Sequence, residues 1–317
     1  MLINITLLII GFLLLIKGAD WLVNGASALA KRFNISDIII GLTVVAFGTS
    51  APELVVNAIA SYSNHQDIVF GNVIGSNNFN LFVILGITGV IFPISVPVNT
   101  VRKDIPISFA AIIIMFILTN DFFFSGKEIL SRYDGLILLA FFLLFLKYVY
   151  NQFKMHKAQE ENLKKHHSSI QIILLILAGL AGLVFGGKFV VDSAIEIAQF
   201  FGISEKIIGL TIVAAGTSLP ELATSVVAAI KKNNDIAVGN VIGSNIFNIF
   251  LILGISSLIN PLNFNPVFNI DIALLSTGTI LLFLFLFFSK SFQIKRWMAA
   301  VFLIIFISYT VSLIRTI

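Results

Sequence analysis

Two copies of one polar pattern lie in strongly apolar surroundings, and each combines a carboxylate, two hydroxyls and a proline. Residues 48–53 read G-T-S-A-P-E, and residues 216–221 read G-T-S-L-P-E. An offset of 168 positions places Glu53 on Glu221. Carboxylate and hydroxyl oxygens are hard ligands, so these residue types suit a sodium or calcium ion.

A second pattern repeats at the same offset and adds amide groups. Residues 71–80 read G-N-V-I-G-S-N-N-F-N, and residues 239–248 read G-N-V-I-G-S-N-I-F-N. Two patterns in register at one offset indicate an internal duplication of the chain. Ser76 lies four residues before Asn80, as Ser244 does before Asn248, so each pair shares one face of a helix.

The first pattern also predicts interrupted helices. Its helix-breaking residues are Gly48, Pro52, Gly216 and Pro220. Proline has no N–H group and clashes with the carbonyl four residues earlier, so carbonyls near the two glycines lose their helical partners. Non-helical backbone at membrane depth persists only where it lines a cavity or is buried in protein. An ionised carboxylate at that depth costs several kcal/mol, which favours functional roles for Glu53 and Glu221.

The elements that position these residues are membrane-spanning helices. The chain is 58% hydrophobic and only 11% charged, with a mean hydropathy of +1.01, whereas soluble domains carry about 25% charged residues. Apolar stretches long enough to cross hydrocarbon, about 20 residues each, fill most of the chain. We therefore expect an all-α polytopic membrane protein. The predicted spans are 2–24, 36–62, 68–92, 104–119, 133–151, 170–199, 205–230, 236–259, 270–289 and 297–314.

A polar segment, 152–169, separates two five-span halves, 1–151 and 170–317, and we interpret it as a cytoplasmic linker. Positive charge concentrates in alternate connections, which hold Lys31, Arg32, Arg102, Lys103, Lys147, Lys154, Lys157, Lys164, Lys165, Lys231, Lys232, Lys290, Lys295 and Arg296. The positive-inside rule assigns these connections to the cytoplasm and both termini to the outside. An odd number of spans per half then predicts ten helices in two inverted five-helix repeats, as in secondary transporters of the plasma or inner membrane.

The chain lacks the residues and motifs that several other classes of function require. Cysteine is absent, and the histidines, His65, His156, His166 and His167, lie in or near polar connections, which disfavours soft-metal sites. Hydrolase and nucleotide-binding motifs are also missing, so we expect no enzyme and no cofactor. The net charge of +4 reflects the cytoplasmic bias and does not indicate nucleic-acid binding. The expected partners are the lipid bilayer and the transported cations, with no obligatory protein partner.

The paired signatures resemble those of a known family. G-T-S-x-P-E together with G-N-x-x-G-S-N-x-x-N, present in both halves, is similar to the alpha repeats of the sodium/calcium exchangers in the calcium:cation antiporter superfamily. The resemblance covers the whole chain and is closest to the prokaryotic type with a short central loop. It implies an antiporter that exchanges sodium for calcium by alternating access, with the sodium gradient driving the extrusion of calcium.

The same resemblance implies a role for each residue of the patterns. The implied calcium ligands are the carboxylates of Glu53 and Glu221 and the main-chain carbonyls of Thr49 and Thr217. Flanking sodium sites would share the two carboxylates, one with Ser50, Ser244 and the Ala46 carbonyl, the other with Ser76, Ser218 and the Ala214 carbonyl. Asn80 and Asn248 would complete the centre. Spans 1 and 6 would slide past spans 2, 3, 7 and 8.

The chain departs from the family at one point. Many exchangers carry Asp at one of the two central amide positions, whereas this chain has Asn80 and Asn248. The centre then holds two formal negative charges, enough to neutralise one calcium ion. A calcium/proton antiporter of the same superfamily is the nearest alternative, since either glutamate could carry protons, and a cation channel is a more distant one.

Overall fold

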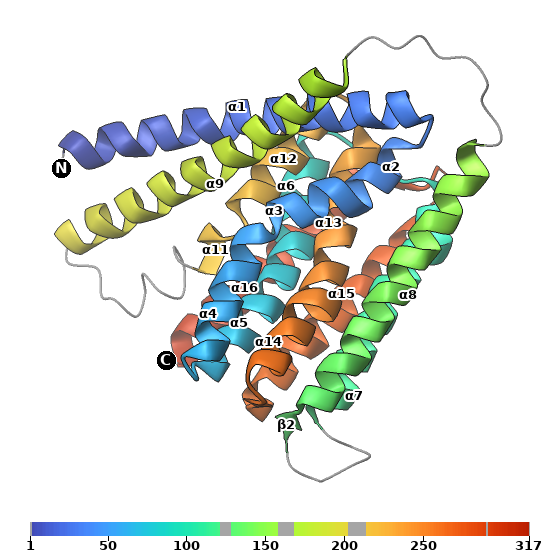
Figure 1. Cartoon of the computed structure of the whole chain (residues 1–317). Coiled ribbons are helices and arrows are strands. Elements are labelled where there is room, and N and C mark those ends of the chain that lie inside the picture. Colours follow the sequence, from blue (N-terminus) through green and yellow to red (C-terminus); the bar gives the residue numbers. More distant parts are fainter. Residues whose placement is uncertain (1, 121–127, 158–167, 202–213, 290, 317) are drawn as a thin grey trace. The chain divides into compact units, whose positions relative to one another are not determined.

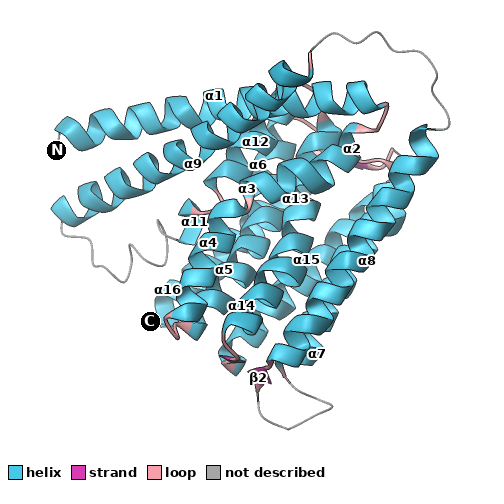
Figure 2. Ribbon diagram, in the orientation of Figure 1, coloured by secondary structure: helices cyan, strands magenta, loops and turns pink. Residues whose placement is uncertain are grey.

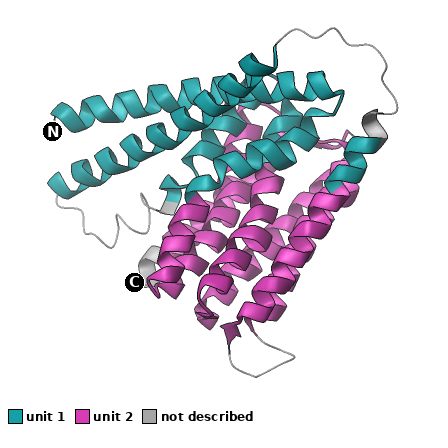
Figure 3. Cartoon of the chain, viewed as in Figure 1, with its two compact units in different colours: residues 1–52, 149–240 teal, residues 53–148, 241–317 magenta. Residues whose placement is uncertain are grey.

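A computed structural model describes residues 2–120, 128–157, 168–201, 214–289 and 291–316, and helices account for most of them (Figures 1 and 2). The chain divides into two compact units (Figure 3). Unit 1 comprises Met1–Pro52 and Val149–Asn240, and unit 2 comprises Glu53–Tyr148 and Val241–Ile317. Each unit therefore takes residues from both halves of the sequence.

Unit 1 is built mainly from two long helices and several short ones. Its elements are α1 (Leu2–Phe33), α2 (Asp37–Ile40), the π-helical η1 (Gly41–Val45), α3 (Ala46–Thr49), α9 (Ser169–Phe200), α11 (Ala214–Gly216), α12 (Leu219–Ile230) and the part of α13 (Asn234–Ile246) that precedes Val241. The N-terminus of α9 carries a capping box between Ser168 and Gln171, which satisfies main-chain donors that the helix leaves unpaired.

Glycines bring α1 and α9 into backbone contact. A Cβ atom on Gly18 would lie 2.8 Å from the carbonyl oxygen of Gly179, and one on Gly11 would lie 2.9 Å from that of Gly186. Because the earlier glycine of α1 meets the later glycine of α9, the two helices run antiparallel (Figure 1). Small residues at such contacts let membrane helices approach closely.

The two faces of α1 are both apolar. Leu15, Ala19 and Leu22 are buried in the core of unit 1, whereas Ile9 and Phe12 are 55% and 48% exposed. A helix that is apolar on both its buried and its exposed face is suited to packing on protein with one side and on lipid with the other.

Unit 2 contains the remaining spans and the short strands that join their ends. Its elements are α4 (Ala51–Tyr62), α5 (Gln66–Asn78), η2 (Phe79–Ile84), α6 (Leu85–Ile91), β1 (Ile94–Ser95), η3 (Thr100–Asp104), α7 (Ile105–Thr119), β2 (Ile129–Leu130), α8 (Arg132–Lys157), η5 (Phe247–Leu253), α14 (Gly254–Ile259), β3 (Leu262–Asn263), η6 (Pro266–Phe268), α15 (Asn269–Phe288), β4 (Gln293–Ile294) and α16 (Arg296–Thr316); α4 and α8 each extend a few residues into unit 1. Strand β1 pairs antiparallel with β4, and β2 pairs antiparallel with β3.

Aromatic rings fill much of the core of unit 2. Phe82 packs edge-on against Phe302 with ring centroids 5.6 Å apart, and Phe70 packs against Phe264 at 5.1 Å. Both Phe70 and Phe82 are fully buried. Such pairs add directional contacts to the burial of apolar surface, and they hold α5 and η2 against α16 and the segment that precedes α15.

Several helices are able to cross a membrane. In the described part of the chain, seven are long and apolar enough: Leu2–Phe33, Gln66–Ile91, Arg132–Lys154, Ser169–Phe200, Asn234–Ile259, Pro266–Phe288 and Arg296–Leu313. An eighth is added if Asp37–Thr49 and Ala51–Tyr62 form one broken span. The predicted helical, multi-span class is confirmed, whereas the total of ten stays a prediction.

The two remaining predicted spans differ from the expectation for separate reasons. The span 104–119 corresponds to α7, which has only 15 residues, although the π-helical η3 continues it at the N-terminal side. The span 205–230 lies partly in 202–213, outside the described residues, and α12 accounts for its last 12 residues. Helix α8 continues to Lys157, into the segment predicted as a linker, since no proline or glycine interrupts residues 149–157.

Candidate ion-binding site

The first repeated pattern breaks its helix at the same residue in both copies. Helix α3 ends at Thr49, and Ser50 has φ −85° and ψ 8°. At the second copy Ser218 has φ −89° and ψ 6°, directly before α12. The prolines Pro52 and Pro220 lie in the first turn of the helices that follow, where a missing N–H group costs little. The backbone is therefore non-helical beside both hydroxyl–carboxylate patterns.

A buried hydrogen bond joins the two copies within unit 1. The hydroxyl of Ser50 donates to Oε1 of Glu221 at 2.8 Å. Ser50 is 3% exposed and Glu221 is 1% exposed. Because the single hydroxyl proton of Ser50 points to the carboxylate, its lone pairs remain as acceptors. The contact brings together two residues that are 171 positions apart and that the family resemblance predicts as sodium ligands.

An asparagine that the sequence left without a role supports this contact. Thr49 donates its hydroxyl to Oδ1 of Asn240 at 3.0 Å. The amide nitrogen of Asn240 is 3.0 Å from Oγ of Ser225 and 3.3 Å from the main-chain oxygen of Glu221. Asn240 thus links the end of α3 to the first turns of α12. Its signal was available in the sequence, since it is the second residue of the repeated G-N-V-I-G-S-N pattern.

Of the predicted backbone ligands of unit 1, Thr49 and Thr217 lie at these breaks, whereas Ala46 and Ala214 lie one helical turn earlier. The Ala46 carbonyl keeps its helical partner, unlike the expectation for carbonyls near Gly48. The Ala46 carbonyl accepts the main-chain N–H of Ser50 at 3.0 Å and is 3.3 Å from Oγ1 of Thr49. Ala214 begins α11, and Thr217 falls in the turn between α11 and α12. Ser218, in the same turn, is fully buried.

The other predicted carboxylate belongs to unit 2. Glu53, in the first turn of α4, is 1% exposed. Its main-chain oxygen accepts the amide of Asn57 at 2.7 Å, and Asn57 is itself fully buried. Both glutamates are therefore removed from water, each in the first turn of a helix that follows a serine break. The N-terminal turn of a helix favours negative charge.

The central amides are held by two further asparagines of unit 2. Nδ2 of Asn80 donates to Oδ1 of Asn245 at 3.0 Å, and Nδ2 of Asn248 donates to Oδ1 of Asn77 at 2.9 Å. All of these residues are at most 4% exposed. Asn80 and Asn248 are each the second residue of a π-helical segment, η2 and η5, a backbone form that is frequent at functional sites. Asn77 and Asn245 stand in the repeated pattern but had no assigned role.

The predicted serines of unit 2, Ser76 and Ser244, lie on α5 and α13, the helices that directly precede η2 and η5. Ser76 donates to Oδ1 of Asn72 at 3.1 Å. The hydroxyl of Ser244 is fully buried, and among the described residues it has no hydrogen-bond partner. A buried hydroxyl without a partner is costly, and an ion or a water molecule would satisfy it.

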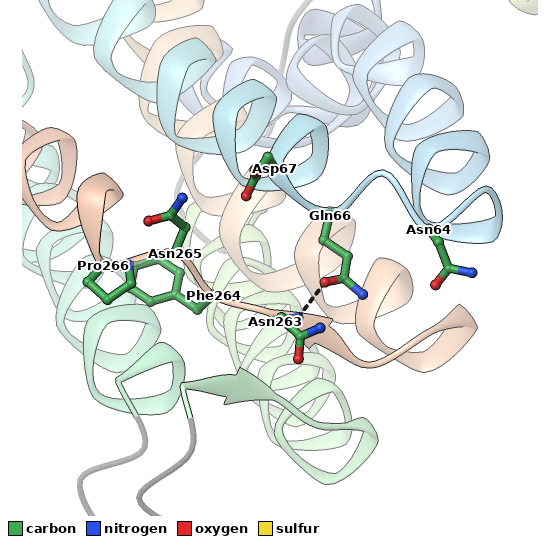
Figure 4. A pocket seen from close by; sticks show the side chains of 7 residues that line it. All are labelled: Asn64, Gln66, Asp67, Asn263, Phe264, Asn265 and Pro266. Carbon is green, nitrogen blue, oxygen red and sulfur yellow. Dashed lines mark hydrogen bonds between the residues drawn. The ribbon is translucent and has the colours of Figure 1, made fainter.

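A polar pocket of about 460 Å³ lies elsewhere in unit 2 (Figure 4). It is lined by Asn64, Gln66, Asp67, Asn263, Phe264, Asn265 and Pro266. Figure 4 shows the side chain of Gln66 bonded to the main chain of Asn263, at 3.0 Å. None of the predicted ion ligands lines this pocket, which is formed by the connections that follow α4 and α14.

No group of three or more His, Cys, Asp and Glu that could hold a metal ion is found among the residues that the structure describes. A cation would therefore rely on hydroxyl, amide and main-chain oxygens beside the glutamates. Because most of these oxygen ligands are uncharged, they suit an ion that is bound and then released.

The sequence pattern of the family described as sodium/calcium exchanger protein matches residues 3–151 and 171–315. These ranges cover nearly the whole chain. The chain belongs to the sodium/calcium exchanger family. The family is one of membrane transporters, so membership confirms the resemblance and the predicted class of function, and it places the protein in a membrane.

Relatives of this exchanger match it over almost their full length. An uncharacterized membrane protein of Methanocaldococcus jannaschii is 38% identical over 305 residues, 96% of each chain. The sodium/calcium exchanger MaX1 of Methanosarcina acetivorans is 32% identical over 349 residues, 98% of each chain. The solved structure of the sodium-calcium exchanger NCX_Mj, soaked with zero Na⁺ and Ca²⁺, matches with a TM-score of 0.83 and 36% identity, covering 98% of this exchanger and 99% of that chain.

Proposed function

We propose that this protein exchanges sodium for calcium across the cell membrane by alternating access and normally extrudes calcium. The observation that carries the proposal is the buried bond between Ser50 and Glu221, which joins the two copies of a pattern typical of the family. An ionised carboxylate buried in a membrane protein is costly and marks an ion path. The inward sodium gradient would supply the driving force.

We assign the carboxylates of Glu53 and Glu221 to calcium, together with the carbonyls of Thr49 and Thr217. Sodium would use the same carboxylates with Ser50, Ser244 and the Ala46 carbonyl, or with Ser76, Ser218 and the Ala214 carbonyl. The orientation of the Ser50 hydroxyl supports this assignment. The hydroxyl donates its proton in a hydrogen bond to Glu221, which leaves its lone pairs available to a cation. Since both ions need the same carboxylates, binding of one would exclude the other.

We also propose that the ten spans form two inverted repeats, 1–151 and 170–317. The bounds of several elements support a repeat at the offset of 168: α4 and α12, α5 and α13, and β1 and β3. In unit 1, α1 and its counterpart α9 run antiparallel, as inversion requires.

The strands of unit 2 support the inversion independently. Strand β1 precedes α7, and β1 pairs with β4. At the other end of α7, Asn120 exchanges side-chain hydrogen bonds of 3.1 and 2.8 Å with Asn269, at the start of α15. Strand β3, the counterpart of β1, lies close before α15 and pairs with β2. The two counterparts therefore lie at opposite ends of α7.

Orientation in the membrane follows from the positive charges, with both termini outside and the central segment in the cytoplasm. The test uses single cysteines in a chain that has none. Lys232→Cys should react with an impermeant thiol reagent only from the cytoplasm, and Asn64→Cys only from outside. Labelling of both from one side would refute the arrangement.

The function itself is tested by flux in proteoliposomes. An outward sodium gradient should drive calcium uptake into vesicles, and a proton ionophore should leave that uptake unchanged. Uptake that needs a proton gradient would instead identify a calcium/proton antiporter. Calcium current without any counter-ion would identify a channel.

The site is tested by Glu221→Gln and Glu53→Gln, which remove one charge each and should abolish exchange. Glu196→Gln is the matched control, because Glu196 is an exposed carboxylate on α9 and its loss should leave exchange intact. Wild-type flux in Glu221→Gln protein would refute the assignment of the site.

A further inference from the structure

Asn77 and Asn245 occupy matching positions of the repeated pattern, and both are buried at the contact between α5 and the α13–η5 helix in unit 2. We propose that they are positioning residues that hold the central amides of Asn80 and Asn248 with their carbonyl oxygens available to the transported cation. The inference rests on the proposed function, since it assigns a cation to the two amide oxygens.

The orientation of the two positioning residues is determined by main-chain oxygens. Nδ2 of Asn77 donates to the main-chain oxygen of Asn245 at 3.3 Å, and Nδ2 of Asn245 donates to that of Asn77 at 3.4 Å. A carbonyl oxygen only accepts hydrogen bonds. Each side chain must therefore turn its nitrogen to the opposite backbone, which leaves its Oδ1 atom as an acceptor.

These Oδ1 atoms in turn orient the central amides. Oδ1 of Asn245 accepts Nδ2 of Asn80, and Oδ1 of Asn77 accepts Nδ2 of Asn248. If either central amide flipped, two oxygens would face each other and a hydrogen bond would be lost. The choice between oxygen and nitrogen, which depends on the hydrogen-bond network, is thus determined at both central positions.

The consequence is a pair of buried oxygen atoms that receive no hydrogen bond from the described residues. Asn80 and Asn248 are each 1% exposed, and within the described part of the chain their Oδ1 atoms receive no hydrogen bond. A buried acceptor without a donor is unfavourable. A hard cation, or water bound to one, would satisfy both oxygens, whereas an amide turned the other way would present N–H groups that repel it.

The first experiment measures the Michaelis constants for calcium and sodium in proteoliposomes. Asn77→Ala should raise both constants about 10- to 100-fold, the loss typical when a partner that orients a metal ligand is removed, with a much smaller change in the maximal rate. Asn78→Ala is the matched control. Asn78 lies beside Asn77 on α5 and is similarly buried, but its amide donates to the main-chain oxygen of Asp271 at 3.1 Å.

The second experiment asks whether orientation is the whole role. A carboxylate has two equivalent oxygens and needs no partner to orient it, so Asn248→Asp should make the site insensitive to Asn77. The double variant N77A/N248D, assayed at alkaline pH, should have the constants of N248D alone. A packing role for Asn77 predicts no such rescue, and equal losses in Asn77→Ala and Asn78→Ala would also overturn the proposal.

If Asn77→Ala does not fold, the equivalent variants at Asn245 and Asn80 provide the same test. Asn245→Ala should raise the constants in the same way, and N245A/N80D should restore them. If neither single variant folds, failure of both double variants to bind calcium, measured by thermal shift, would count against positioning. Failure of wild-type vesicles to exchange sodium for calcium would refute the proposed function, whereas normal wild-type exchange without the rescue would refute this inference alone.

Discussion

The groups around Glu221 in unit 1 and those around Asn80 and Asn248 in unit 2 bind their neighbours in different ways. Glu221 is ionisable, and its partner Ser50 is a hydroxyl that can rotate. The central amides are neutral and planar, and each is held in one orientation by an asparagine across the helix contact. If both groups bind the transported ions as proposed, the carboxyl group can adapt to ions of different charge, whereas the amide oxygens present the same ligands to both.

This difference predicts that mutations at the two groups affect ion binding in different ways. Loss of an amide should weaken the binding of sodium and calcium together. Loss of a hydroxyl beside the carboxylate should affect sodium more than calcium. Changes remote from both groups should alter stability or rate but leave ion affinity intact.

Among changes that keep both glutamates, the largest effect is expected at the central amides. Asn248→Leu removes a proposed neutral oxygen ligand and the amide that donates to Oδ1 of Asn77. The apparent affinities for sodium and calcium should both fall about 100-fold, the upper end of the losses seen when a group that supports a metal is removed. Ion-dependent thermal shifts measure both affinities, and a loss confined to one ion would break the comparison.

A smaller effect, selective for sodium, is expected at Ser50, whose hydroxyl donates to Glu221. Ser50→Ala removes a hydroxyl and its hydrogen bond to Glu221 but keeps the carboxyl group itself. Sodium affinity should fall about tenfold, equivalent to about 1.4 kcal/mol. Calcium/calcium self-exchange should survive, because calcium relies on the carboxylates. Ser63→Ala, at an exposed serine after α4, is the control. Parallel loss of sodium-driven exchange and self-exchange would contradict separate sodium ligands.

The contact between α1 and α9 offers a change in stability without a change in affinity. A Cβ atom on Gly186 would lie 2.8 Å from the carbonyl oxygen of Gly11, whereas one on Gly187 would come no closer than 3.9 Å to Pro220. Gly186→Ala should lower stability by about 1–3 kcal/mol through overpacking, and Gly187→Ala should not. Thermal unfolding in detergent distinguishes them, and unequal ion affinities of the two variants would show that this contact also shapes the site.

The smallest effect is expected at the surface of unit 1. The ammonium of Lys231 lies 2.6 Å from Oδ1 of Asp20 and donates to Oδ1 of Asn24 at 2.7 Å, tying α12 to α1. Because exposed ion pairs contribute at most about 1 kcal/mol, Lys231→Met should lower stability only slightly, and high salt should erase the difference. A loss that persists in high salt would assign this contact a larger role than its exposure implies.

Much of the candidate site was readable from the chain alone. The family resemblance implied that Ser50 and Glu221 both bind sodium, and the structure brings their side chains to 2.8 Å. Pro52 and Pro220 predicted interrupted helices, because a residue without an N–H group cannot continue one, and the breaks lie at Ser50 and Ser218.

The π-helical segments were not readable in this way. Segments η2 and η5 follow Asn78 and Ile246 without any glycine or proline to mark them. Their residues are ordinary apolar helix and strand formers, so local preference does not distinguish a π-helix from an α-helix there. The packing around Asn80 and Asn248 decides it.

The sequence by itself determined the class of the protein, because composition and a repeated pattern of oxygen-bearing side chains depend only on the order of residues. It also identified Glu53, Glu221 and the serines as residues of one chemistry. The tertiary structure alone decided the roles of Asn77, Asn240 and Asn245. An asparagine side chain carries both a donor and an acceptor. Which of them faces a given neighbour depends on partners supplied by a segment far away in the chain, as when Asn77 meets Asn245 at a separation of 168 residues.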